Sequence, residues 1–510
     1  MNPTDTKRPL AEPVRAVPLA MDAAAFRAAG HALVDQLAEL LAAIPTGPVT
    51  RGESPSVVRE ALALNAALPE HGTAPGPLLA ETARLLFEHS LFNAHPRFMG
   101  YITSSPAPIG ILGDLLAAAV NPNVGAWVLS PAATEIEAQT VRWISELIGY
   151  PTTCGGLLVS GGNMANMVGF WAARAACASW DVRAQGLAAG PRLRVYASAE
   201  THTWIHKAAD LAGLGTDSVR FVSTGDDLRM DMSELERQLR ADRAAGDVPF
   251  LVVGTAGSVS TGVIDDLPAI AALAKREQLW FHVDGAYGGF AAAVPGVPSD
   301  LLALSGADSV AVDPHKWLYA PLEAGCALVR DPAALTKAFS YHPPYYHFGE
   351  SATNFVDHGP QNSRGFRALK VWLALRHAGA AGYRRMIADD MALAGVLAGT
   401  VKQHPELEFQ THDLSITTWR CVPSDLRARI GDSAVDAYLD VLNKELLSRI
   451  QQGGEAFVSN AVIRGRYVLR ACIVNFNTRE SDMHAVAELS ARMGRAIDAE
   501  LRPAELRARG

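Results

Sequence analysis

A lysine between an apolar strand and a run of aromatic residues is the first part of this sequence that could do chemistry. The stretch Asp308–Val312 is apolar and β-branched, which predicts a short buried strand, and Lys316 stands just beyond it, beside Trp317. An ammonium group is expensive to bury, so these surroundings favour the neutral amine. A neutral, nucleophilic amine is what Schiff-base chemistry requires. Alone, such a lysine is more often a surface residue, so the hypothesis depends on the rest of the chain.

Two glycines after another predicted strand could hold a phosphate group. The strand Gly156–Val159 is followed by Gly161 and Gly162, and a predicted helix opens at about Asn163. Glycines permit close approach of the backbone, and the free N–H groups at a helix start attract an anion. Two glycines after a strand are more often a simple turn, so this feature is weak by itself.

Asp284 and His202 also follow predicted strands. The carboxylate of Asp284 would be half buried and would need a cationic or N–H partner, such as the protonated nitrogen of a pyridine ring. Ala286 is small enough for a flat ring to lie against it. His202 could stack on such a ring. Alternatively, Asp284 caps the glycine-rich turn and His202 only begins a helix.

Taken together, these features are the parts of a pyridoxal-phosphate site, in the order phosphate cradle, stacking histidine, acidic partner and lysine. The chain resembles the group II pyridoxal-phosphate-dependent decarboxylases, the family of aromatic-L-amino-acid, glutamate and histidine decarboxylases. The segments that carry the resemblance are DPHKW, HVDGAYGG, HPRFMGYITSSP, SPAATEIE and NSRGFRALKVW, and the similarity covers roughly residues 22–501.

The resemblance implies an α/β fold of the aspartate-aminotransferase type (fold type I) and a homodimer with active sites at the subunit interface. It implies pyridoxal 5'-phosphate as cofactor, with Lys316 bound to it covalently, Asp284 paired with the ring nitrogen and His202 stacked on the ring. Asp313 departs from the family pattern, which has asparagine beside the phosphate. The other residues implied at the cofactor are Gly161, Gly162, Asn163, Thr255, Ala286 and His315.

The resemblance also suggests the reaction. Tyr345 matches the proton donor of the family, with Tyr346 as the neighbouring candidate, and relatives with phenylalanine there form aldehydes. Decarboxylation of an aromatic L-amino acid to an amine and CO2 is therefore expected. Alternatives are an aldehyde synthase, an aminotransferase, a non-enzymatic cofactor-binding protein, or a decarboxylase of an acidic amino acid with Arg97 at the substrate. The residues expected to contact substrate are Tyr101, Ile102, Ser104, Trp127 and Ser363.

The elements that must position these residues alternate between short apolar runs and helical stretches, which is typical of a mostly parallel α/β sheet. A long helix with a capping box at Thr134 and Glu137 is expected before the first strand, although Ser130 could cap it one turn earlier. The domain predictions are an arm over 1–20, a helical dimerisation segment over 21–105, a cofactor domain over 106–395 with a mobile loop at 339–363, and a small α+β domain over 396–510. The expected strands are 156–159, 193–197, 219–222, 250–254, 280–283, 308–312 and 325–329.

Composition excludes several other classes of protein. The chain has 510 residues and a formal net charge of −8, without a basic stripe that would bind nucleic acid. Its five cysteines are scattered, which indicates reduced thiols rather than a disulfide framework or a metal site. No signal peptide or apolar membrane span is recognisable, so a cytoplasmic location is expected.

Overall fold

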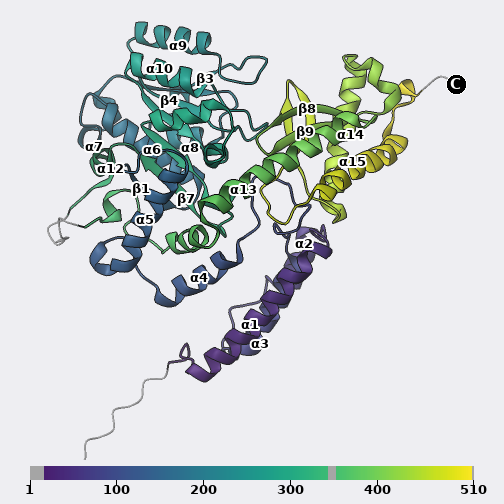
Figure 1. Cartoon of the computed structure of the whole chain (residues 1–510), viewed down its shortest axis with the longest axis horizontal. Helices are drawn as coiled ribbons and strands as arrows, with labels where there is room; N and C mark the ends of the chain where they lie inside the picture. The colour runs from purple at the N-terminus through teal and green to yellow at the C-terminus, as the bar shows by residue number, and fades with distance from the viewer. Residues whose placement is uncertain (1–16, 343–351, 508–510) are drawn as a thin grey trace, which may run out of the picture.

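The structure is a computed structural model that describes residues 17–342 and 352–507. It contains a large α/β domain, a smaller α+β domain and a pair of N-terminal helices that project from the body (Figure 1). Among the described helices, none combines the length and the apolar character that crossing a membrane requires.

The large domain is built on a seven-stranded sheet with the order β1-β7-β6-β5-β4-β2-β3. Neighbouring strands from β6 to β3 run parallel, and only β7 is antiparallel to both of its neighbours. The predicted mostly parallel sheet is therefore confirmed, and each predicted strand lies within two residues of its observed bounds. The strands are β1 (Gly155–Val159), β2 (Leu193–Ser198), β3 (Val219–Val222), β4 (Val248–Thr255), β5 (Trp280–Asp284), β6 (Ser309–Val312) and β7 (Gly325–Val329).

Helices pack against this sheet and bury its apolar side chains. The expected capping box at Thr134 is wrong, because α5 already begins at Pro131, where proline suits the first helical position. Glu137 instead turns inward and accepts a hydrogen bond of 2.8 Å from the backbone N–H of Leu158. The helices of this domain are α5 (Pro131–Leu147), α6 (Gly162–Cys177), α7 (Val182–Gln185), α8 (Trp204–Leu211), α9 (Met232–Ala244), α10 (Leu267–Glu277), α11 (Pro314–Trp317) and α12 (Pro332–Phe339).

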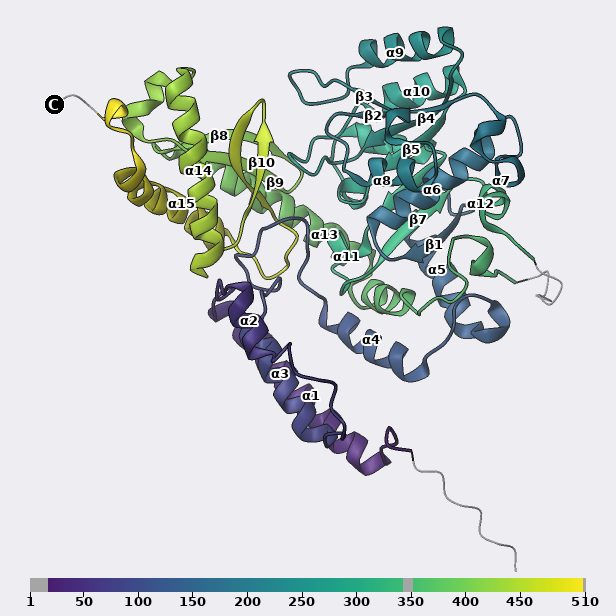
Figure 2. The same cartoon turned by 180° about the vertical axis from the view of Figure 1, so that it is seen from behind.

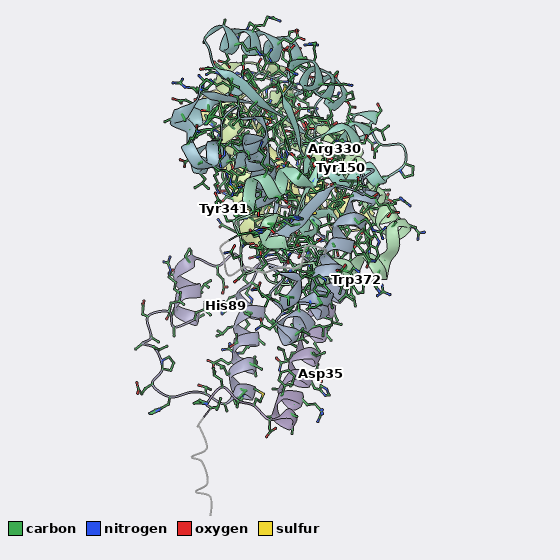
Figure 3. The ribbon with its side chains drawn as sticks, turned by 90° about the vertical axis from the view of Figure 1, so that its left-hand side faces the viewer. Asp35, His89, Tyr150, Arg330, Tyr341 and Trp372 are labelled. Carbon is green, nitrogen blue, oxygen red and sulfur yellow. The ribbon has the colours of Figure 1, made fainter. Side chains whose placement is uncertain are left out.

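The N-terminal helices extend away from the body. The helices α1 (Ala23–Ala43) and α3 (Pro75–His89) lie side by side, with α2 (Pro55–Ala61) near their base (Figure 2). Figure 3 shows Asp35 and His89 on these helices, outside the body that holds Tyr150 and Arg330. The α4 helix (Pro108–Val120) then leads back into the large domain. Large apolar side chains remain exposed on α1, α3 and α4.

One long helix joins the two domains. α13 (Ala368–Gln403) runs from the large sheet to the small domain, with a bend at Gly379, whose φ is 66° (Figure 1). It passes through the predicted boundary at residue 396. The small domain has an antiparallel sheet of order β10-β11-β9-β8 covered by two helices, as the sequence predicts. Its elements are β8 (Leu407–Asp413), β9 (Ile416–Cys421), α14 (Ser433–Gly453), β10 (Ser459–Ile463), β11 (Arg466–Cys472) and α15 (Glu480–Leu501).

Candidate active site

The residues that the sequence singled out meet at the carboxyl-terminal edge of the large sheet. β4, β5 and β6 are parallel neighbours, so their ends lie together, which is where open α/β sheets bind ligands. A cavity of about 260 Å³ opens at this edge. The sequence-predicted residues that line it are Tyr101, Ile102, Gly162, Asn163, His202, Thr255, Asp284, Ala286, Asp313 and Lys316.

Lys316 lies in α11, the short helix that follows β6. Its Nζ is 2.9 Å from Oδ2 of Asp313, and the two side chains are 19% and 2% exposed. Nε2 of His315 is 3.7 Å from the same oxygen. The second oxygen of Asp313, Oδ1, is buried and has no hydrogen-bond partner among the described residues. A carboxylate with unused accepting capacity therefore holds the amine at the cavity.

The hydrogen bonds that Asp284 accepts from the described chain come from neutral groups. Its Oδ2 accepts a bond of 2.7 Å from the indole Nε1 of Trp204, and its Oδ1 accepts one of 3.2 Å from the backbone N–H of Ala286. Asp284 is buried. A buried carboxylate in such surroundings gains most from a cationic N–H partner, which is what a protonated ring nitrogen provides.

His202 stands just before α8 and is held by the backbone. Its Nδ1 accepts a hydrogen bond of 3.2 Å from the N–H of Trp204. Burial lowers the pKa of His202 from its ordinary value of 6.5; Lys316 acts in the same direction, and Asp284 opposes both. The imidazole is therefore neutral at neutral pH, and it can lie against a flat ring without adding a positive charge.

The start of α6 is packed so closely that only glycine fits. A Cβ at Gly162 would lie 2.5 Å from Oδ2 of Asp313 and 2.9 Å from Cβ of Ala286. Gly161 has a φ of 113°, a backbone conformation that residues with a side chain rarely adopt, and a Cβ there would lie 3.1 Å from Cε1 of His315. The backbone thereby presents the N-terminus of α6 directly to the cavity, and that end of a helix suits a phosphate.

Comparison with known proteins identifies the family. Residues 56–418 match the pyridoxal-dependent decarboxylase conserved domain. The chain belongs to this family. An aromatic-L-amino-acid decarboxylase of Bacillus atrophaeus is 31% identical over 470 residues, covering 91% of this chain and 94% of the relative. A phenylacetaldehyde synthase of a Rosa hybrid cultivar is 29% identical over 468 residues, covering 89% and 91%. The crystal structure of Oryza sativa TDC with PLP and tryptamine is similar with a TM-score of 0.86 and 29% identity, covering 95% of this chain and 100% of that one.

The family and the cavity agree on the cofactor. The protein is a carboxy-lyase that uses pyridoxal 5'-phosphate, and the predicted fold type is confirmed by the structural relative. The donor set fits that cofactor: Lys316 provides an amine, Asp284 a buried carboxylate for a ring nitrogen, and α6 a helix N-terminus for a phosphate.

Several of the predicted residues lie away from the cavity of a single chain. Ser104 is buried beside the turn after β6 that carries Lys316, here called the lysine turn, and it donates a hydrogen bond of 2.8 Å to the carbonyl of His315. Trp127 is exposed and donates through Nε1 to Glu135. Ser363 is also exposed. The expected proton donors, Tyr345 and Tyr346, lie outside the described residues.

An arginine from the small domain, not among the residues predicted from the sequence, also lines the cavity. Arg470 lies on β11 and is almost fully buried; Nη1 donates to the carbonyl of Tyr101 and to Oγ of Ser459. Its Nε and Nη2 have no partner among the described residues, and burial lowers its pKa. A charge inside the apolar run YVLRACIVNF was the available signal, because such a group requires a partner. Arg97, the arginine considered from the sequence, instead pairs with Asp482 at 3.0 Å.

Proposed function

We propose that this decarboxylase acts on an aromatic L-amino acid of the tyrosine, tryptophan or phenylalanine type and releases the amine and CO2. The observation that carries the proposal is the composition of the cavity wall, to which Tyr101, Ile102 and Val259 contribute aromatic and apolar surface. Such a surface favours a flat apolar side chain over a charged one. The name of the relative from Bacillus atrophaeus supports the same substrate class.

The positions of the side chains at the cavity support the residue roles that we propose. Lys316 would hold the cofactor through Nζ, and Asp284 would keep a proton on the ring nitrogen. His202 would support the ring, and the N-terminus of α6 at Gly162 and Asn163 would hold the phosphate. When bound, the cofactor supplies an electron sink for the pair left behind by the departing CO2. Thr255 and Ala286 complete the walls beside Asp284.

Tyr345 is assigned as the group that returns a proton to Cα. This assignment rests on the match between YHPPYYH and the family pattern, since Tyr345 lies outside the described residues. A phenolic O–H can deliver a proton at the end of the reaction, whereas phenylalanine cannot. Amine formation is therefore proposed over aldehyde formation.

Arg470 supports a second candidate, a decarboxylase of an acidic amino acid. Its guanidinium has donor capacity that the described chain does not use, and it lines the cavity beside Tyr101. With an aromatic substrate, Arg470 binds the α-carboxylate that all amino acids share. With an acidic substrate, it binds the carboxylate of the side chain. Both assignments use the same group, so only the substrate distinguishes them.

A substrate panel tests these proposals. Purified protein with pyridoxal phosphate is incubated in air with L-tyrosine, L-tryptophan, L-phenylalanine, L-glutamate and L-aspartate, and products are followed by mass spectrometry. Amines from the aromatic substrates are expected. Amine only from glutamate or aspartate would replace the aromatic assignment with the acidic one, and aldehyde with peroxide would contradict the role of Tyr345.

We also propose that the protein acts as a homodimer with active sites at the subunit interface. The α4 helix exposes Leu112, Leu115, Leu116 and Val120, an apolar surface that a second copy could cover. Trp127 and Ser363 would then meet the cavity of the partner. Analytical ultracentrifugation is expected to give a dimer that Leu115→Glu dissociates, whereas Leu302→Glu, at an exposed leucine of the body, leaves it intact. A wild-type monomer that retains activity would contradict the proposal.

A further inference from the structure

A buried carboxylate on the domain-linking helix contacts two aromatic residues of the turn that carries Lys316. Asp390 lies on α13 and is 1% exposed. Its Oδ2 accepts a hydrogen bond of 2.9 Å from Nε1 of Trp317 and one of 2.7 Å from the hydroxyl of Tyr319. These two donors follow the lysine in sequence, by one and three residues. One oxygen atom therefore fixes the two aromatic side chains that follow Lys316.

The backbone of this turn is strained where Asp390 holds it. Tyr319 has a φ of 52°, a left-handed conformation that a bulky residue adopts only when its surroundings impose it. The N–H of Tyr319 donates to the carbonyl of Lys316 at 3.2 Å, so this strained residue is bonded directly to the lysine. The hydrogen bond from the Tyr319 hydroxyl to Asp390 is one of the contacts that can maintain this conformation.

Both aromatic rings are also packed against other parts of the chain. The ring of Trp317 stacks on Tyr287 with centroids 4.8 Å apart, and Tyr319 lies parallel to Tyr383 of α13 at 6.4 Å. The hydroxyl of Tyr383 donates to the carbonyl of Leu318 at 3.0 Å. The lysine turn is thus tied to α13 at three consecutive residues, and Asp390 is the only charged group in these ties.

A carboxylate is not the group that packing alone would favour at this position. Burial raises the pKa of Asp390 to about 7, and the hydrogen bonds from Tyr319, Trp317 and the backbone of Asn475 only partly offset that rise. Asp389 is the charged neighbour that acts on it, and it raises the pKa further. An ionised Asp390 therefore costs stability, which is understandable if its hydrogen bonds serve the site.

We propose that Asp390 is a positioning residue that sets the direction in which Lys316 presents its amine to the cofactor. It acts through Trp317 and Tyr319 and couples the lysine turn to the helix that joins the two domains. The proposal does not depend on which amino acid is the substrate. It does require that Lys316 carries the cofactor, as proposed above, so wild-type protein that fails to bind pyridoxal phosphate would refute that assignment first.

The test compares Asp390→Asn with Asp389→Asn, a control on the preceding residue of the same helix, where the side chain is exposed. Cofactor-free proteins are titrated with pyridoxal phosphate, and the visible absorption of the lysine-bound cofactor is followed as a function of pH. We expect Asp390→Asn to weaken cofactor binding and to shift the pH midpoint of the absorption. We also expect kcat to fall about 10- to 100-fold, with a smaller change in KM, because small displacements of a reacting group change rates by this much. Asp389→Asn should match the wild type in cofactor affinity and kcat, because it leaves both hydrogen bonds to Asp390 in place and removes only a charge that raises the pKa of Asp390.

A second variant separates positioning from folding. Tyr319→Phe deletes only the hydroxyl that donates to Asp390 and keeps the packed ring. We expect the same spectral shift, in a smaller amount, and the double variant Asp390→Asn/Tyr319→Phe should resemble Asp390→Asn rather than the product of both effects. If Asp390→Asn and Tyr319→Phe both retain wild-type cofactor affinity, absorption and kcat, the proposal is wrong. If Asp390→Asn does not fold, Tyr319→Phe alone decides in the same way.

Discussion

Replacing Arg470 by methionine should reduce activity strongly while leaving stability nearly unchanged. Methionine fills a similar volume without a charge. The variant removes a buried guanidinium that has two unpartnered nitrogens, and it also removes the hydrogen bonds from Nη1 to Tyr101 and Ser459. If the remaining donors bind a substrate carboxylate, the chemistry loses a charge-assisted contact that the fold does not need.

The magnitudes for Arg470→Met can be worked from these contacts. A hydrogen bond to a charged group contributes about 1.5–3 kcal/mol, which corresponds to about a 10- to 150-fold loss in kcat/KM. KM should account for most of the loss, because the bound carboxylate leaves as CO2. For stability, two lost hydrogen bonds cost about 0.5–1.5 kcal/mol each, and relief of an uncompensated buried charge offsets them. In a chain of this length 1 kcal/mol corresponds to about 1 °C in Tm, so we expect a shift within about 2 °C.

The assay pairs steady-state kinetics with thermal unfolding and uses Arg364→Met as the contrasting variant. Arg364 is as buried as Arg470, but it forms an ion pair with Glu137 and donates to the carbonyls of Val124 and Leu158. Removing it leaves Glu137 unpaired, so a loss of about 3–5 kcal/mol in stability is expected. An Arg470→Met protein with wild-type kcat/KM, or with a loss of Tm as large as that of Arg364→Met, would refute the reasoning.

Four further outcomes are expected. Lys316→Ala should abolish turnover, and multiple turnovers of any substrate would exclude its covalent role. Tyr345→Phe should still release CO2 but form aldehyde in air, and unchanged amine output would reassign the proton donor. Asp313→Asn removes a negative charge beside Lys316 and the N-terminus of α6, where the anionic phosphate is proposed to bind. The cofactor-free variant should therefore bind pyridoxal phosphate about tenfold more tightly. Weaker binding in a titration would contradict this. Folding raises the pKa of Asp390 from 3.8 to about 7, so its stabilising contribution is complete below pH 4 and is lost as pH rises through about 7. Between pH 4 and 7 the Tm of Asp390→Asn should therefore fall less than the Tm of the wild type. Parallel curves of Tm against pH would argue against the raised pKa.

Part of the candidate site was predictable because it is encoded locally. Asp284 ends an apolar strand and Lys316 stands shortly after the next one, and the parallel arrangement of these two strands brings their ends to one edge without further information. Thr255, at the end of β4, was expected only from the family resemblance. Gly162 carries a weaker local signal, a second glycine after a strand, and the packing that excludes a side chain there comes from Asp313 and Ala286, far away in the chain. The family motifs then add the identity of the cofactor.

Local signals failed where a side chain depends on a distant element. The capping box at Thr134 and Glu137 was wrong, and the alternative start at Ser130 is the one observed, because Glu137 is used by Leu158 and Arg364, far away in the chain. The sequence also does not predict which arginine lines the cavity. Arg97 pairs with Asp482, and Arg470 reaches the cavity instead.

The sequence alone therefore determined the residues whose position follows from one strand and its next turn. The tertiary structure decided the contacts made across domains. Arg470 comes from β11 of the small domain and Asp390 from α13, and both reach the large domain only because the two domains pack together. The physical reason is that strand periodicity and turn chemistry are properties of neighbouring residues, whereas the partner of a buried charge is set by how separate elements dock.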